Sequence, residues 1–162
     1  MRMNKCIYIL AVDDNLKNLK LVSNLLKEKD YKIALATDGK SALKIVEENK
    51  IDLILLDIMM PEMDGFEVCK ILKSKPETKD IPVIFLTAKN DTEDIVKGFK
   101  LGGVDYITKP FKREELIVRV NNHVQLKMVK DYLVAAQKET KKSRDFFMRV
   151  LYDLGKIIDK DK

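Results

Sequence analysis

The sequence predicts an α/β fold: a five-stranded parallel sheet with helices covering both faces, followed by a helical extension. Two observations lead to this prediction. Short apolar runs alternate with amphipathic segments along the first 127 residues, as is typical of consecutive βαβ units. The runs are apolar at nearly every position, which is expected of strands that are buried on both faces. Right-handed βαβ connections place such strands parallel to one another in a single doubly wound sheet.

Each apolar run has the length of one strand and is followed by a polar residue. We expect the five strands at Cys6–Val12, Lys32–Ala36, Leu53–Leu56, Pro82–Leu86 and Val104–Ile107. The segments between them carry apolar residues three or four positions apart, which is the spacing of one face of a helix. We expect four helices at Asn15–Glu28, Gly39–Glu48, Phe66–Leu72 and Thr92–Lys100, and a fifth that opens near Lys112.

The composition is that of a globular protein, because 162 residues of which 46% are hydrophobic can bury a core. The apolar run after the charged start ends at Val12, which is too short for a signal peptide or a membrane span. Cys6 and Cys69 lack a metal-ligand spacing and lie in apolar stretches, so we interpret them as reduced thiols of the core. We therefore expect a cytoplasmic protein with no membrane attachment.

The net charge of +5 is unevenly distributed along the chain. Residues 1–111 hold 18 Lys and Arg against 18 Asp and Glu, whereas residues 112–162 hold 13 against 8 and carry the whole excess. Acidic and basic residues are mixed along this C-terminal part, which favours a solvated helix face over a nucleic-acid surface. We expect no direct binding to nucleic acid.

Five polar side chains follow the predicted strands. They are Asp13 and Asp14 after the first strand, Asp57 after the third, Thr87 after the fourth and Lys109 after the fifth. Open parallel sheets bind their ligands outside the carboxyl ends of the strands. Each residue taken singly has an ordinary structural explanation, but five of them at one edge of the sheet indicate a functional site.

The residue types at this edge indicate phosphoryl transfer to a carboxylate. Three clustered carboxylates repel one another unless a cation joins them, and Mg²⁺ prefers such oxygen ligands. The ion also neutralises a phosphoryl group under attack by an aspartate nucleophile such as Asp57. Lys109 is suited to pair with one phosphoryl oxygen, and Thr87 to donate a hydrogen bond to another. The product would be a readily hydrolysed aspartyl phosphate, which suits a transient signal.

Four motifs, taken in this order, resemble the receiver domains of response regulators from two-component signalling. They are Asp13-Asp14 after an apolar strand, Asp57-Ile58-Met59-Met60-Pro61-Glu62-Met63-Asp64-Gly65, Thr87-Ala88 and Tyr106-Ile107-Thr108-Lys109-Pro110-Phe111. The resemblance covers about residues 5–127 and implies a flavodoxin-like sheet with the strand order 2-1-3-4-5. We therefore expect a receiver domain at residues 1–127 and a helical extension at residues 128–162, which is either a coiled coil or hairpin in its own right or the linker to an output domain.

The resemblance also implies a role for each residue of the site. Asp57 would accept a phosphoryl group from a histidine kinase or phosphotransfer protein, and Lys109 would bind that group. Asp14, Asp57 and the backbone carbonyl of Met59 would ligate Mg²⁺ directly, while Asp13 would act largely through water.

Further residues resemble the switch and the loops of this family. Thr87 would move toward the phosphoryl group, and Tyr106 would turn inward on activation. The peptide bond between Lys109 and Pro110 corresponds to the family's cis-peptide site. We expect Gly65 to supply a turn conformation that a side chain would oppose.

The segment that follows the fifth strand is unusually long for a lone receiver. A seam of ten residues, eight of them apolar, is spaced alternately three and four apart, consisting of Leu126, Val129, Leu133, Ala136, Thr140, Ser143, Phe147, Val150, Leu154 and Ile157. A continuous coiled coil and a helical hairpin broken at Lys138–Ser143 both fit this pattern. In either case Phe146–Ile158 needs a partner surface. We favour a homodimer through residues 120–162 over packing on the chain's own receiver.

Three classes of function fit these motifs to different degrees. A phosphorylation switch that rearranges the C-terminal helices fits all of them. An aspartyl-phosphate hydrolase generally needs a second acid two residues after the nucleophile, where this chain has Met59. Some receivers place an amide or acid there to position water, so Met59 also predicts slow self-dephosphorylation. A DNA-binding regulator is disfavoured by the mixed charge of the tail.

We therefore expect a switch that catalyses only its own phosphoryl transfer, not an enzyme with a separate substrate. His123 is the only histidine, and we interpret it as a helix-surface residue without a partner.

Overall fold

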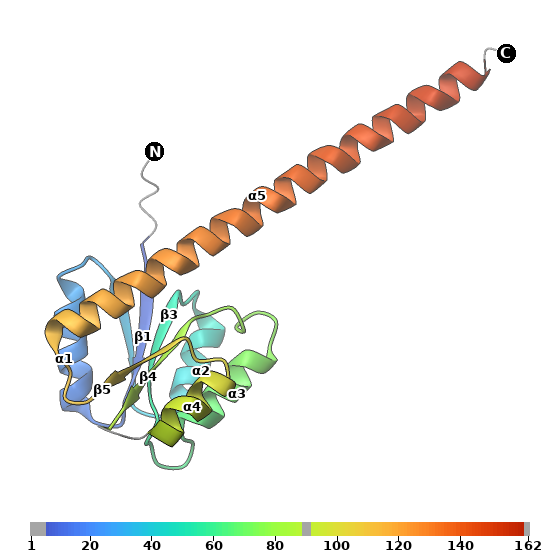
Figure 1. The fold of residues 1–162 in the computed structure, drawn as a ribbon. Helices are drawn as coiled ribbons and strands as arrows, with labels where there is room; N and C mark the ends of the chain where they lie inside the picture. Colours follow the sequence, from blue (N-terminus) through green and yellow to red (C-terminus); the bar gives the residue numbers. More distant parts are fainter. Residues whose placement is uncertain (1–5, 89–91, 161–162) are drawn as a thin grey trace. The chain divides into compact units, whose positions relative to one another are not determined.

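The computed structural model describes residues 6–88 and 92–160 and contains one five-stranded sheet (Figure 1). Its strands are β1 (Tyr8–Val12), β2 (Lys32–Ala36), β3 (Leu53–Asp57), β4 (Val83–Thr87) and β5 (Asp105–Thr108). All neighbouring strands are parallel, in the order β2-β1-β3-β4-β5. This confirms the predicted fold class and strand order. The parts of our predictions that concern residues 1–5, 89–91 and 161–162 lie outside the described residues.

Five helices alternate with the strands along the described part of the chain. They are α1 (Leu16–Lys27), α2 (Gly39–Glu48), α3 (Gly65–Ser74), α4 (Thr92–Lys100) and α5 (Arg113–Lys160). Figure 1 shows α2, α3 and α4 on one face of the sheet, with α1 and the start of α5 on the other. Polar side chains begin the first three helices, since Asn15, Asp38 and Asp64 each accept a hydrogen bond from the first turn.

The core lies on both faces of the interior strands β1, β3 and β4, and the last two are buried at every residue. Cys69 belongs to this core, but Cys6 is exposed, so the expectation of a core thiol is wrong for Cys6. Alternate strand residues point to opposite faces. Leu10, Ile54 and Val83 thereby join one cluster with the apolar faces of α2 and α3. Because the middle of the sheet is fixed from both sides, the carboxyl ends of β1, β3 and β4 are held in register at one edge.

The chain divides into two compact units, residues 1–125 and residues 126–162. In the second unit, α5 continues without interruption through Lys138–Ser143, so the hairpin alternative is wrong. Every described side chain from Tyr132 onward is exposed. None of the helices described here is both long and apolar enough to cross a membrane.

Candidate functional site

Backbone hydrogen bonds continue between neighbouring segments just beyond the ends of the strands. They hold in place the residues that follow each strand. The amide of Asp13 donates to the carbonyl of Ala36 at 3.1 Å, and the amide of Lys109 donates to the carbonyl of Thr87 at 2.8 Å. Asp57 is itself the last residue of β3 and pairs in register with Leu86 of β4. The predicted site residues therefore stand on fixed backbone at one edge, and Asp13, Asp57 and Thr87 are buried there.

The amine of Lys109 bridges two of the buried carboxylates. Its Nζ lies 2.8 Å from Oδ2 of Asp13 and 3.0 Å from Oδ1 of Asp57. Asp13 also accepts hydrogen bonds from the amide of Asn15 at 2.8 Å and from Nδ2 of Asn18 at 3.0 Å. Asp57 accepts one from the amide of Met59 at 3.3 Å. Asp57 is thus the less fully satisfied of the two carboxylates.

The charges around Asp57 do not balance within the described residues. Burial raises the pKa of Asp57, Lys109 and the amide of Met59 oppose this, and the nearby charge of Asp13 adds to it, so the net direction is upward. Burial would lower the pKa of Lys109, but its bonds to Asp13 and Asp57 outweigh that effect and raise it. Lys109 therefore stays charged at neutral pH, and the site still favours a further cation.

The acidic cluster has the ligand chemistry for that cation. Asp13, Asp14 and Asp57 each offer a carboxylate oxygen, and these oxygens lie within 4.8 Å of one another. Asp14 is exposed while the other two are buried, so a bound ion would keep one side open to solvent. Oxygen-only donors and room for water suit Mg²⁺ better than a softer metal.

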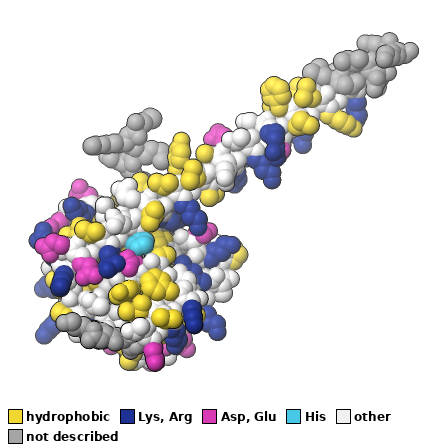
Figure 2. Space-filling view, in the orientation of Figure 1, with side chains coloured by type: hydrophobic (Ala, Val, Ile, Leu, Met, Phe, Trp, Pro, Cys, Tyr) yellow, Lys and Arg dark blue, Asp and Glu magenta, His cyan; other side chains and the backbone are white. Residues whose placement is uncertain are grey.

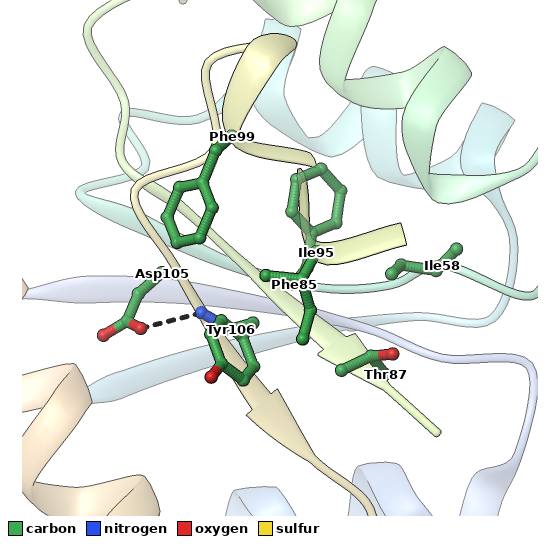
Figure 3. A pocket seen from close by; sticks show the side chains of 7 residues that line it. All are labelled: Ile58, Phe85, Thr87, Ile95, Phe99, Asp105 and Tyr106. Carbon is green, nitrogen blue, oxygen red and sulfur yellow. Dashed lines mark hydrogen bonds between the residues drawn. The ribbon is translucent and has the colours of Figure 1, made fainter. Parts of the chain in front are cut away.

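Thr87 and Tyr106 line one pocket beside this cluster (Figure 3), with Ile58, Phe85, Ile95, Phe99 and Asp105 as its other members. The Thr87 hydroxyl donates to the carbonyl of Ala88 at 3.1 Å. The half-buried ring of Tyr106 meets Phe99 edge to face at 6.2 Å between centroids. In Figure 3 its hydroxyl lies on the side away from Thr87. The two predicted switch residues are thus neighbours across a pocket.

An ionic cluster at the start of β5 was missed by sequence reasoning. Arg119 approaches both oxygens of Asp105, at 2.8 and 3.0 Å, and Nε2 of His123 lies 3.0 Å from Oδ2. Burial opposes ionisation of Asp105, but the amide of Tyr106, His123 and Arg119 together lower its pKa. The expectation that His123 has no partner is therefore wrong, and its side chain is only 17% exposed. The four-residue spacing of Arg119 and His123 was the available signal, because it puts both on one helix face.

The loop after Asp57 corrects one expectation and confirms another. Gly65 is the first residue of α3 and has no positive φ; a Cβ added to it would lie 2.3 Å from the carbonyl oxygen of Asp57. Glycine is needed there for close approach, not for a turn. Glu62 is the loop residue with positive φ, at 66°. The peptide bond between Lys109 and Pro110 is cis, as predicted.

The chain belongs to the response regulator receiver domain family, which matches residues 9–121. It is 48% identical over 126 residues to the "Probable cyclic di-GMP phosphodiesterase" of Vibrio cholerae, covering 78% of this chain and 28% of that protein. It is 41% identical over 125 residues to the response regulator PleD of Caulobacter vibrioides, covering 77% and 28%. The chain therefore spans less than a third of the length of these two relatives.

The solved structures agree with this assignment. The receiver domain of the Francisella response regulator 1452 is 38% identical and superimposes with a TM-score of 0.68, covering 74% of this chain and 97% of that one. The match confirms the predicted receiver family and fold. Receivers bind Mg²⁺ at an acidic pocket, and the cluster of Asp13, Asp14 and Asp57 is a pocket of that kind.

Proposed function

We propose that Asp57 accepts a phosphoryl group from a histidine kinase or a phosphotransfer protein, and that the chain is a phosphorylation switch of a two-component system. One observation carries this proposal: the buried Asp57 carboxylate lies 3.0 Å from a lysine amine and beside two further aspartates. In the transfer, an Asp57 oxygen forms a bond to phosphorus while the bond from phosphorus to the donor's histidine nitrogen breaks. The histidine nitrogen leaves with the electron pair of that bond.

The surrounding residues have separate parts in this step. Asp14, Asp57 and the backbone carbonyl of Met59 would hold Mg²⁺, with Asp13 acting largely through water, and the ion would neutralise charge on the phosphoryl oxygens. Lys109, which already contacts Asp57, would turn from the carboxylate to a phosphoryl oxygen. The amide of Met59 keeps Asp57 oriented through its 3.3 Å hydrogen bond.

Thr87 and Tyr106 would report the phosphorylated state. The Thr87 hydroxyl donates its hydrogen bond to a neighbouring backbone carbonyl. A phosphoryl oxygen is charged and is therefore a stronger acceptor. Thr87 would therefore turn toward Asp57, and the space that it vacates in the shared pocket would admit the ring of Tyr106. This movement changes the surface formed by α4, β5 and α5.

We further propose how the switch is organised. Residues 1–127 act as a cytoplasmic receiver, and residues 128–162 act as a helical extension that transmits its state. The output is a homodimer through residues 120–162, with no direct contact to nucleic acid and no catalytic turnover of a separate substrate. The exposed apolar seam of α5 supports this dimer.

Incubation with Mg²⁺ and a small phosphodonor tests the proposal. Intact mass should increase by one phosphoryl group per chain, and Asp57→Asn should abolish the increase while leaving the fold intact. Glu62→Gln, in the exposed loop after Asp57, is the matched control and should be phosphorylated normally. Sustained hydrolysis of added phosphoesters would instead identify a phosphatase and overturn the proposal.

A further inference from the structure

We propose that residues 126–151 of α5 pair with the same residues of a second copy as a parallel, in-register coiled coil, in which Glu139 of each chain pairs with Arg144 of the other. This rests on the proposed homodimer and adds its orientation, its register and the residues that select them. The observations that carry it are the exposed seam, the residues that flank it and the local hydrogen bonding of its polar positions.

The seam is an exposed apolar stripe, which broadens at residues 146–152 because Phe146, Met148, Leu151 and Tyr152 are also exposed. Leu133 and Phe147 are 55% and 68% exposed although both are large and apolar, and Figure 2 shows hydrophobic side chains in separate groups on this helix, with Lys and Arg side chains between them. The spacing from Leu126 to Val150 places two core positions in every seven, as in a two-stranded coiled coil. The opposite side of the helix carries charges, including Asp131, Lys138 and Asp145. The stripe therefore fits one equivalent helix.

The residues that flank the seam favour a parallel arrangement. With Leu126 as the first core position of a heptad, the last position of each heptad faces a position five residues further along on the second copy. Glu139 then faces Arg144, which is an attractive pair. Phe146 likewise faces Leu151, which is an apolar pair that widens the seam. These two contacts join side chains of matching chemistry, and the third contact of this kind, Tyr132 with Gln137, is neutral.

An antiparallel pairing of the same stretch matches these residues poorly. The first heptad position of one helix then faces the fourth heptad position of the other. Thr140 therefore lies opposite Ser143, and Leu133 opposite Val150. In that arrangement Glu139 lies beside Phe146 of the second copy, and the charge has no partner. The antiparallel arrangement is therefore less stable than the parallel one, because it desolvates an unpaired carboxylate beside an aromatic ring.

The polar residue Thr140 in the middle of the seam can be buried without losing its hydrogen bond. The Thr140 hydroxyl donates to the carbonyl of Ala136 at 3.0 Å, so it leaves no unsatisfied donor in a dimer core. A shallow groove lined by Leu133, Ala136, Gln137, Thr140, Lys141 and Arg144 follows these small side chains. Arg144 is 72% exposed, and its contact with Asp145 spans 4.0 Å, at the limit of an ion pair. Its guanidinium is therefore available to a second chain.

A charge-exchange experiment tests the pairing in the whole chain. Glu139→Lys alone places two Lys–Arg contacts in its homodimer, and Arg144→Glu alone places two Glu–Glu contacts. Mixing the two variants restores two attractive contacts in the heterodimer. With beryllium fluoride and Mg²⁺ present as a phosphoryl mimic, the heterodimer should form roughly fivefold more tightly than either homodimer. Equal affinities would contradict the pairing.

Disulfide trapping tests orientation independently, in a Cys6→Ser background that leaves only the buried Cys69. Ala136→Cys should cross-link with itself, whereas Lys138→Cys on the outer face should not. Cross-linking of Leu133→Cys with Val150→Cys, but of neither with itself, would show an antiparallel pair and overturn the inference.

Phosphorylation of the same variants with Mg²⁺ and a small phosphodonor, in separate samples without beryllium fluoride, separates this inference from the proposed function. Normal phosphorylation of Asp57 together with a dimer that fails both tests overturns the register and leaves the switch intact. A chain that is phosphorylated but monomeric overturns the coiled coil and the dimeric output together. A chain that takes up no phosphate overturns the proposed phosphorylation, whatever the cross-links show.

Discussion

The receiver unit and the C-terminal part of α5 differ in how many of their side chains are buried or hydrogen-bonded within the single chain. In the receiver, Asp13, Asp57 and Thr87 are buried at strand ends with partners, and no buried side-chain nitrogen or oxygen in the described part of the chain lacks one. In α5, every described side chain from Tyr132 onward is exposed, large apolar ones included. The side chains of the first unit find their partners within it, whereas the second unit has an exposed apolar surface that its own helix does not cover.

Truncating one leucine in each unit should give the largest difference between the two units. Leu55 of β3 is fully buried, so Leu55→Ala should lower the free energy of unfolding by about 2–5 kcal/mol. Leu133→Ala removes the same atoms from an exposed site and should change the unfolding of the monomer by less than about 0.5 kcal/mol. It should weaken dimerisation instead. Chemical denaturation and sedimentation measure the two effects, and equal destabilisation of the monomer would contradict the comparison.

Removing the lysine amine should have the next largest effect. Lys109→Ala takes away the only side-chain cation within 3.0 Å of the Asp57 carboxylate in the described residues. Phosphorylation by a small phosphodonor should slow by about 100-fold, because one preorganised charge on the transferred group is lost. Lys112→Ala, an exposed lysine nearby, is the control and should react at the normal rate. A rate within about threefold of wild type for Lys109→Ala would exclude the assigned role.

The contrast between the units also explains what the sequence could predict. The fold and the five strand-end residues followed from local patterns, because a buried strand is apolar throughout and its end is marked by the first polar residue. Asp105 contacts Arg119 and His123, which are 14 and 18 positions away. The spacing of Arg119 and His123 places them on one helix face but does not identify Asp105 as their partner. The role of Gly65 depends on a 2.3 Å approach to the backbone of Asp57, which only coordinates reveal.

The extension was the less predictable half for the same physical reason. A seam repeating every seven residues fits both a straight helix and a hairpin, because both bury the same stripe. Local capping decides between them, and Lys138–Ser143 has neither glycine nor proline to end a helix. The structure accordingly has one helix from Arg113 to Lys160.

Substitution of Met59 should sharpen the account of the receiver by a smaller amount. Its side chain is 71% exposed beside the acidic cluster and cannot orient water through a hydrogen bond. Met59→Asn supplies an amide, so the aspartyl phosphate should be lost roughly fivefold faster, a modest share of what positioning a nucleophile can contribute. The decay of the phosphorylated mass after removal of the donor measures this. No acceleration would show that water reaches the phosphoryl group without help from this position.

The smallest expected effect is on stability against pH. The folded-state pKa of Asp57 is raised, chiefly by burial, so its contribution to stability is full below the ordinary Asp pKa of about 4 and is lost as pH rises through the folded value. Asp57→Asn should therefore melt a few degrees higher than wild type at neutral pH without divalent ions. The gain should vanish in acid. Thermal melts across this pH range measure the effect, with Asp145→Asn as an exposed control. A rise in melting temperature of Asp57→Asn that does not depend on pH would contradict a raised pKa of Asp57.

Association of the whole chain tests most directly whether chemistry at Asp57 controls the seam of α5. Sedimentation equilibrium should be measured for the wild type and for Asp57→Asn, each with and without beryllium fluoride and Mg²⁺. The account predicts that the phosphoryl mimic tightens the wild-type dimer and leaves Asp57→Asn unchanged. A dimer affinity that is the same in all four samples would contradict it.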